Sequence, residues 1–151
     1  MTAGYSGTPL PTKLGIREGA RVVVLGAPPT FAATLGTLPV GATIAARLAG
    51  TSPLDVVIAF VTKRADLAAR IAAVRPRLAQ DGGLWIAWPK RTSKVPTEVT
   101  EDVVRELALP TGLVDNKVCA IDDTWSGLRL VIRRELRADV RSAPRSRSRR
   151  T

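Results

Sequence analysis

The residues best suited to bind a ligand are the cations of two basic loops. Each loop directly follows an apolar run. The runs cover residues 54–61 and 84–88. If both runs are parallel strands, the loops leave the same edge of one sheet, and ligands of open α/β sheets bind at that edge. Cations there could hold phosphate or carboxylate through charge-assisted hydrogen bonds. The alternative is a pair of solvated loops that promote solubility. The cations are Lys63, Arg64, Lys90, Arg91 and Lys94.

A hydroxyl and an indole beside these cations could complete an anion site. Thr92 follows Arg91, and Trp88 ends the apolar run that precedes Lys90. Trp88 could wall a pocket there. The alternative is core packing, because Trp85 and Trp88 point to opposite faces of a regular strand and each would then pack under a helix.

The residue types needed for many kinds of catalysis are missing. The chain has no histidine, which removes the commonest general base, and its one cysteine, Cys119, lies inside a predicted strand as a buried, unreactive thiol. This composition excludes the usual zinc ligands. Asp122 and Asp123 could contact magnesium, but nothing supplies a third ligand. We therefore expect no catalytic residue, no metal and no cofactor. Trp125, just beyond these aspartates, either covers the end of the sheet or contacts a partner.

The turn after the first predicted strand does not fit a nucleotide site. Nucleotide-binding Rossmann domains place a glycine-rich turn there, so that backbone amides can approach phosphate. Here the turn is Gly26-Ala27-Pro28-Pro29-Thr30, with one glycine and two prolines that lack an amide donor. We interpret it as a structural turn, with a modified binding loop as the alternative.

The order of apolar runs and amphipathic segments predicts the fold. Strands are expected at 21–25, 54–61, 84–88, 117–121 and 128–134, helices at 31–38, 66–79 and 100–109, a strand or helical turn at 42–48, and a turn at 81–83. Pro76 should kink or shorten the second helix. Alternation of this kind predicts a single Rossmann-like α/β domain with helices on both faces. Its sheet would be mostly parallel, with about five or six strands and a C-terminal antiparallel pair, an arrangement similar to that of methyltransferase-like Rossmann folds.

The two ends of the chain differ from this body. We expect an N-terminal arm at residues 1–20, pinned by Tyr5, Leu10, Leu14 and Ile16, and the domain itself at 21–136. Residues 137–151 hold six arginines and one aspartate, about half of the net charge of +10. Low complexity predicts that this tail is disordered. Its arginines could bind nucleic acid weakly and without sequence preference, or only keep the protein soluble. Beyond residue 140 they are Arg141, Arg145, Arg147, Arg149 and Arg150.

Four segments within residues 4–134 form a recognisable set. They are Tyr5–Leu10 with Lys13–Ile16, Trp85–Lys90, Leu109–Lys117 and Trp125–Val131. As a set they resemble a bacterial family of uncharacterised proteins, domain of unknown function 3052. The resemblance implies a small cytoplasmic α/β protein and supplies no catalytic residue. The arginine-rich tail lies outside it.

Taken together, these patterns predict a cytoplasmic, non-catalytic module that binds an anionic small molecule or partner at the basic strand ends. No run is long enough to cross a membrane, and no secretory signal is expected. Two alternatives stay open. One is a divergent methyltransferase-like enzyme, and the other is a nucleic-acid accessory protein that acts through its tail.

Overall fold

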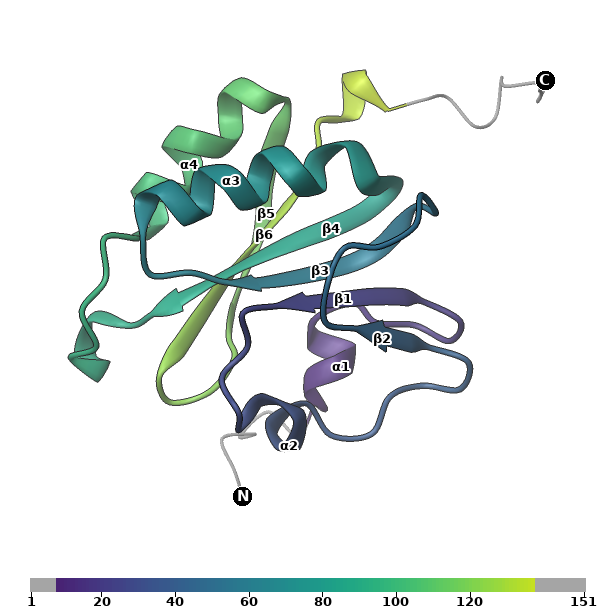
Figure 1. The fold of residues 1–151 in the computed structure, drawn as a ribbon, viewed down its shortest axis with the longest axis horizontal. Helices are drawn as coiled ribbons and strands as arrows, with labels where there is room; N and C mark the ends of the chain where they lie inside the picture. The colour runs from purple at the N-terminus through teal and green to yellow at the C-terminus, as the bar shows by residue number, and fades with distance from the viewer. Residues whose placement is uncertain (1–7, 138–151) are drawn as a thin grey trace.

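The computed structural model describes residues 8–137, while residues 1–7 and 138–151 lie outside the described residues. Its centre is a six-stranded sheet in the order β2-β1-β3-β4-β6-β5 (Figure 1). The strands are β1 (Arg21–Leu25), β2 (Thr43–Ala45), β3 (Leu54–Phe60), β4 (Leu78–Pro89), β5 (Leu113–Ala120) and β6 (Trp125–Ile132). β1 to β4 are parallel to one another, and β6 runs antiparallel to both β4 and β5. The predicted mostly parallel sheet with a C-terminal antiparallel pair is confirmed.

Helices cover both faces of the sheet, as predicted. α3 (Arg64–Val74) and α4 (Glu101–Ala108) lie over one face, and the shorter α1 (Leu10–Lys13) and α2 (Phe31–Leu35) lie on the other (Figure 1). Short 3-10 turns follow several elements: η1 (Arg75–Arg77), η2 (Arg91–Ser93), η3 (Leu109–Thr111) and η4 (Arg134–Leu136). No helix among residues 8–137 is long and apolar enough to cross a membrane.

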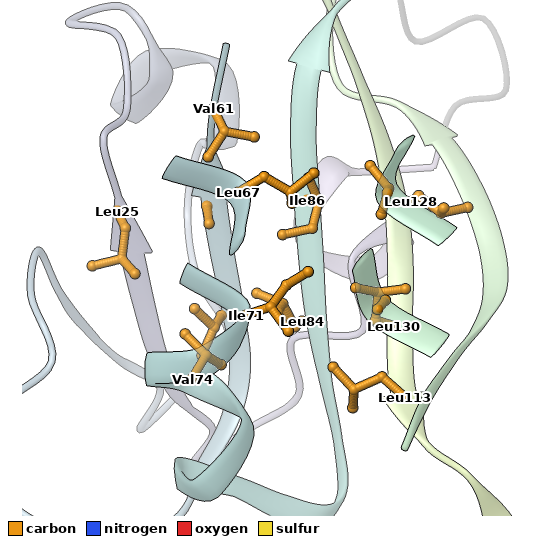
Figure 2. Close-up of a cluster of buried hydrophobic side chains, with 14 of the residues drawn as sticks. Leu25, Val61, Leu67, Ile71, Val74, Leu84, Ile86, Leu113, Leu128 and Leu130 are labelled. Carbon is orange, nitrogen blue, oxygen red and sulfur yellow. The ribbon is translucent and has the colours of Figure 1, made fainter. Parts of the chain in front are cut away.

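The core on the α3–α4 face is built almost entirely from aliphatic side chains. Figure 2 shows Leu67, Ile71 and Val74 of α3 beside Leu84 and Ile86 of β4, and all five are buried. Their spacing of four and three residues places the α3 side chains on one helical face. The near-continuous apolar run of β3 has the composition of a strand buried on both faces.

The core on the α1–α2 face carries most of the aromatic residues. Trp85 is fully buried there, and its indole N–H donates to the Leu14 carbonyl at 2.9 Å. Leu14 and Ile16, expected to pin the arm, are buried in the same cluster, and Leu10 packs against it. Tyr5 lies outside the described residues. This contact fixes the segment after α1 to the middle of the sheet.

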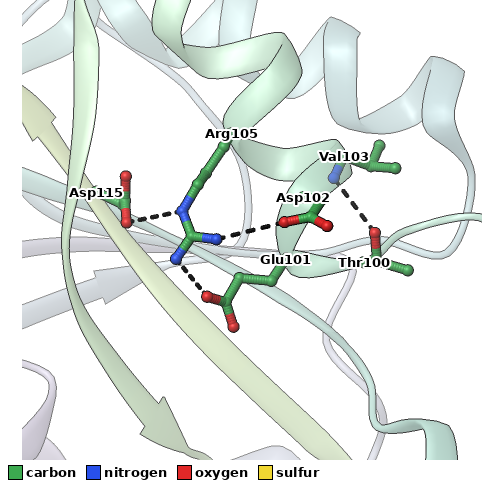
Figure 3. Close-up of polar contacts among 6 residues, drawn as sticks. All are labelled: Thr100, Glu101, Asp102, Val103, Arg105 and Asp115. Carbon is green, nitrogen blue, oxygen red and sulfur yellow. Dashed lines mark hydrogen bonds and ion pairs between the residues drawn. The ribbon is translucent and has the colours of Figure 1, made fainter.

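α4 begins as predicted and is held to the outer strand β5. The Thr100 hydroxyl caps the helix by accepting the Val103 N–H at 3.2 Å (Figure 3). On the next turn, Arg105 donates through Nε to Asp115 of β5 at 3.0 Å and also pairs with Glu101. One guanidinium therefore joins the helix to the edge of the sheet.

Four predictions about local structure need correction or a choice between alternatives. The expected turn at residues 81–83 is wrong, because these residues lie inside β4. α3 ends at Val74, and Pro76 belongs to η1, so the proline shortens the helix. Of the alternatives at residues 42–48, the strand is correct. Trp125, expected in a loop, is the first residue of β6.

Candidate functional site

The carboxyl ends of β3 and β4 bring both predicted basic loops to one edge of the sheet. The two strands are parallel neighbours with Phe60 opposite Ala87, and the Val61 N–H donates to the Ala87 carbonyl at 2.9 Å. Lys63 and Lys90 therefore leave their strands in the same direction. We use the name basic rim for the exposed or half-buried polar residues at this edge: Lys63, Lys90, Arg91, Thr92 and Lys94.

Hydrogen bonds hold the backbone of the loop after β4. They therefore fix the positions from which its cationic side chains extend. The Lys90 carbonyl accepts from the Ser93 N–H at 3.0 Å and from the Ser93 hydroxyl at 2.7 Å. The Lys90 N–H donates to the Thr124 carbonyl at 2.7 Å, which ties this loop to the β5–β6 hairpin. Lys94 adopts a left-handed conformation with φ 63°. The backbone of this part of the rim is thus held by its own hydrogen bonds, while its charged ends face solvent.

The loop after β3 is shorter and lies against the segment that leads into α4. The Thr62 carbonyl accepts from the Glu98 N–H at 2.8 Å and from the Thr97 hydroxyl at 3.3 Å. Lys63 is the residue immediately before α3 and is exposed. The Glu98 carboxylate accepts the Arg64 N–H at 2.9 Å, so one acid lies beside the basic rim.

Arg64 does not stand free with the other cations, which corrects the expected group of five. Its guanidinium forms an ion pair with Glu106 of α4. The hydrogen bond and charge of Arg64 lower the pKa of the Glu106 carboxyl, and Glu106 in turn raises the pKa of Arg64. The reason is the packing of α3 beside α4, which places an acid within reach of the first turn of α3. Arg64 therefore belongs to the contact between these helices.

Trp88 is a core residue, so its predicted role as a pocket wall is not supported. It is 8% exposed and packs in the aliphatic cluster under α3 and α4, whereas Trp85 is buried on the opposite face. The predicted division of these two indoles between the faces is confirmed. It follows from the two-residue period of β4.

Three aromatic rings lie where the chain order of the sheet reverses, between β1 and β3. Phe60 is the last residue of β3, and its ring packs edge-on against two others. The distance between ring centroids is 4.9 Å to Phe31 of α2 and 5.0 Å to Trp125 of β6. Gly26 follows β1 with φ 69°, and a Cβ built there would lie 3.0 Å from the Phe60 carbonyl oxygen. Trp125 thus covers the end of the sheet, one of its two expected roles. Ligands of doubly wound folds bind at such a reversal, and here the buried Phe31 and Phe60 and the partly buried Trp125 pack beside it.

The remaining candidate groups are engaged or buried. The Asp122 carboxylate accepts the N–H groups of Thr124 and Trp125, both at 2.8 Å, and so shapes the hairpin turn. Cys119 is buried as predicted, and burial raises the pKa of its thiol. Within residues 8–137, no three metal-ligating side chains gather in one place. The five tail arginines from Arg141 to Arg150 lie outside the described residues.

One charged feature was missed in the sequence. A cavity of about 810 Å³ lies at the amino-terminal ends of the parallel strands, opposite the basic rim. Lys117 and Arg129 contribute to its lining. Arg129 interrupts the apolar run of β6, which reads Leu128-Arg129-Leu130-Val131-Ile132. A charge at that point of a buried strand was the available signal.

Comparison with solved structures places the fold among S-adenosylmethionine-dependent methyltransferases. Fibrillarin from Methanococcus jannaschii, a pre-rRNA processing protein, aligns with a TM-score of 0.57 at 14% identity over 78% of this chain and 68% of its own. Fibrillarin from Aeropyrum pernix, solved with natively bound S-adenosyl-L-methionine, gives 0.53 at 19% identity, covering 77% and 68%. A SAM-dependent methyltransferase from Aquifex aeolicus gives 0.54 at 15% identity, covering 80% and 87%. The chain therefore has a methyltransferase-like Rossmann fold, and at these identities the likeness concerns the fold alone.

The chain itself belongs to the family of proteins of unknown function DUF3052. The family model matches residues 47–134, which include the segments containing Trp85–Lys90, Leu109–Lys117 and Trp125–Val131. The segment with Tyr5 lies outside the matched residues. A search of curated proteins finds no similar sequence.

Proposed function

We propose that this protein is a non-catalytic binding module that holds an anionic ligand or partner at the basic rim. The observation that carries the proposal is the parallel pairing of β3 with β4, which sends both basic loops from one edge of the sheet. A cytoplasmic location belongs to the same proposal, because a single cysteine is compatible with a reducing compartment.

The charge state of the rim supports binding of an anion. Among the described residues, none of the four rim cations Lys63, Lys90, Arg91 and Lys94 forms an ion pair. Arginine and lysine side chains with free donors make charge-assisted bonds to phosphate or carboxylate. The backbone bonds of Lys90 and Ser93 keep the loop ordered before a ligand arrives, which reduces the entropy lost on binding.

Titration calorimetry with ATP tests this proposal. The Lys90→Ala/Arg91→Ala variant should bind ATP at least tenfold more weakly than the wild type, because two charge-assisted bonds of ~1.5–3 kcal/mol each are lost. The matched control is Arg21→Ala/Arg134→Ala, which removes the same charge from exposed positions at the opposite edge of the sheet. Its affinity should stay within about twofold of the wild type. Equal affinities for the wild type and the rim variant, or no binding at all, would contradict the proposal.

The second candidate is a divergent methyltransferase-like enzyme, and the likeness of the fold favours it. Two features of this chain oppose it. The turn after β1 carries prolines at positions 28 and 29, and aromatic side chains pack beside the reversal point. We expect no heat on titrating S-adenosylmethionine to millimolar concentration into the wild type. A saturable heat would favour the enzyme over the binding module.

A further inference from the structure

A second basic region lies at the amino-terminal ends of the parallel strands, away from the basic rim. A cavity of about 810 Å³ opens there between the segment 12–20, Asp55 near the start of β3, Asp81 in the first half of β4, and the antiparallel strands β5 and β6. We use the name amino-end cavity for it. Its volume falls within the range of small-molecule sites, ~300–1,000 Å³.

Arg129 projects from the middle of β6 toward this cavity. Its neighbours Leu128 and Leu130 are fully buried in the core under α3 and α4, so the alternation of the strand turns Arg129 to the opposite face. The guanidinium lies over Gly83 of β4, where a built Cβ would be only 2.5 Å from Nε. The missing side chain at Gly83 thus provides the space that the guanidinium occupies.

Among the described residues, more cations than acids act on the charge of Arg129. Lys117 is its direct partner across β5 and β6, and like charges at directly opposed positions repel. Lys13 and Arg17 also line the cavity. Among residues 8–137, no hydrogen bond or ion pair involves the Arg129 side chain. Burial lowers the pKa of Arg129, and Arg137 and Arg17 lower it further, while Asp81 acts in the opposite direction. Since arginine keeps its proton, an anion would relieve this cost.

The acidic residues that line the cavity indicate which chemical groups the rest of the ligand should carry. Asp55 is engaged, because its carboxylate accepts the Arg21 N–H at 2.8 Å. Glu18 and Asp81 are exposed and line the same space. Carboxylates only accept hydrogen bonds when ionised, so they suit hydroxyl donors and would repel a ligand that is anionic along its whole length. The lining therefore combines a cationic part with a part that accepts from hydroxyls.

We propose that the amino-end cavity binds a phosphorylated polyol, with Arg129 and Lys117 contacting the phosphate and Glu18 and Asp81 facing the hydroxyls. Arginine and phosphate match in geometry as well as charge, since the guanidinium can donate two parallel bonds. This site is independent of the basic rim, because the two lie at opposite ends of the parallel strands.

Titration calorimetry with ribose 5-phosphate tests the proposal, with inorganic phosphate and ribose as separate probes. The wild type should bind ribose 5-phosphate more tightly than phosphate and should not bind ribose. Arg129→Met should weaken binding of ribose 5-phosphate at least tenfold. Arg134→Met removes an equal charge from an exposed position outside the cavity and should change the affinity less than twofold. The rim variant Lys90→Ala/Arg91→Ala should also bind as the wild type does, which separates this proposal from the one above.

Circular dichroism and thermal melting verify that each variant is folded. If Arg129→Met does not fold, Lys117→Gln replaces it, because Lys117 is exposed and its ammonium donates to the Lys13 carbonyl at 3.1 Å rather than packing in the core. The proposal is overturned if the wild type fails to bind ribose 5-phosphate, or if Arg129→Met and Lys117→Gln both bind it normally. It is equally overturned if the rim variant alone loses binding.

Discussion

Two adjacent glycines determine how closely the backbone and side chains approach β4 near its beginning. A Cβ built at Gly82 would lie 2.7 Å from the Leu54 carbonyl oxygen and 3.0 Å from that of Asp55. At Gly83 the obstacle is the guanidinium of Arg129, the end of a flexible side chain. The backbone of β3 cannot move away without breaking its pairing, whereas the guanidinium can. The two glycines therefore differ in what they tolerate.

We expect Gly82→Ala to destabilise the protein by ~1–3 kcal/mol, the usual cost of overpacking. Gly83→Ala should cost less, because Arg129 can swing aside into the amino-end cavity. Urea denaturation followed by tryptophan fluorescence measures both free energies of unfolding. A Gly83→Ala variant that is the less stable of the two would show that the reasoning about the obstacles is wrong.

The same residues show why local sequence patterns mislead. Asp81-Gly82-Gly83 has the composition of a turn, and the sequence predicts one. In the structure, the glycines are needed for contacts with β3 and with Arg129, residues far away in the chain. A shift of register between Leu54 and Val56 accompanies them. Sheet pairing overrides turn propensity here, and only the pairing partners could have revealed it.

At the scale of elements, apolar runs predicted the central strands well. No sequence pattern predicted the ion pair between α3 and α4. The runs at 21–25 and 54–61 became β1 and β3 because buried parallel strands are recognisable from composition. Likewise, Thr100 marked the start of α4. The pair between Arg64 and Glu106 depends on how α3 lies beside α4, and nothing in either segment indicates it. Arg64 was therefore assigned to the rim although the helix contact engages it.

The Arg64–Glu106 pair gives a pH-dependent contribution to stability. The folded state lowers the pKa of Glu106 below its ordinary value of 4.5. The contribution is therefore present above pH 4.5 and is lost as the pH falls through the lower folded pKa. Glu106→Gln should be less stable than the wild type at pH 7, and the difference should shrink as the pH falls below 4.5. Urea denaturation at pH 7, 4.5 and 3 measures this, with Glu135→Gln as the control. A difference that persists unchanged at pH 3 would assign the effect to packing.

At the scale of the whole molecule, positive charge is found at both ends of the parallel strands and in the sequence beyond them. The basic rim lies at the carboxyl ends of the parallel strands, and the amino-end cavity lies at their amino ends. Arg137, the last described residue, donates through Nε to the Ile132 carbonyl at 2.8 Å, which holds the end of the described chain against β6. The chain can therefore be shortened after Arg137 without loss of a described contact.

Removal of residues 138–151 tests whether the tail contacts nucleic acid. Five arginines are lost, and each phosphate contact with a single strand contributes ~0.7 to the slope of log affinity against log salt. The slope for a single-stranded oligonucleotide should therefore decrease by up to ~3.5. Fluorescence anisotropy at several salt concentrations measures it, with a glycine–serine tail of equal length as the control. If the truncated protein keeps the full slope, the accessory role of the tail is excluded.

The position of β6 also restricts how this protein can assemble while it is being made. β6 lies between β4 and β5, although it follows both of them in the sequence. Until Ile132 has emerged, one side of β4 has no neighbour, and the faces around Trp85 and Trp88 are incomplete. A nascent chain stalled before residue 125 would present an open, apolar strand edge that other chains could pair with. Emergence of β6 is thus the step that gives β4 its second neighbour.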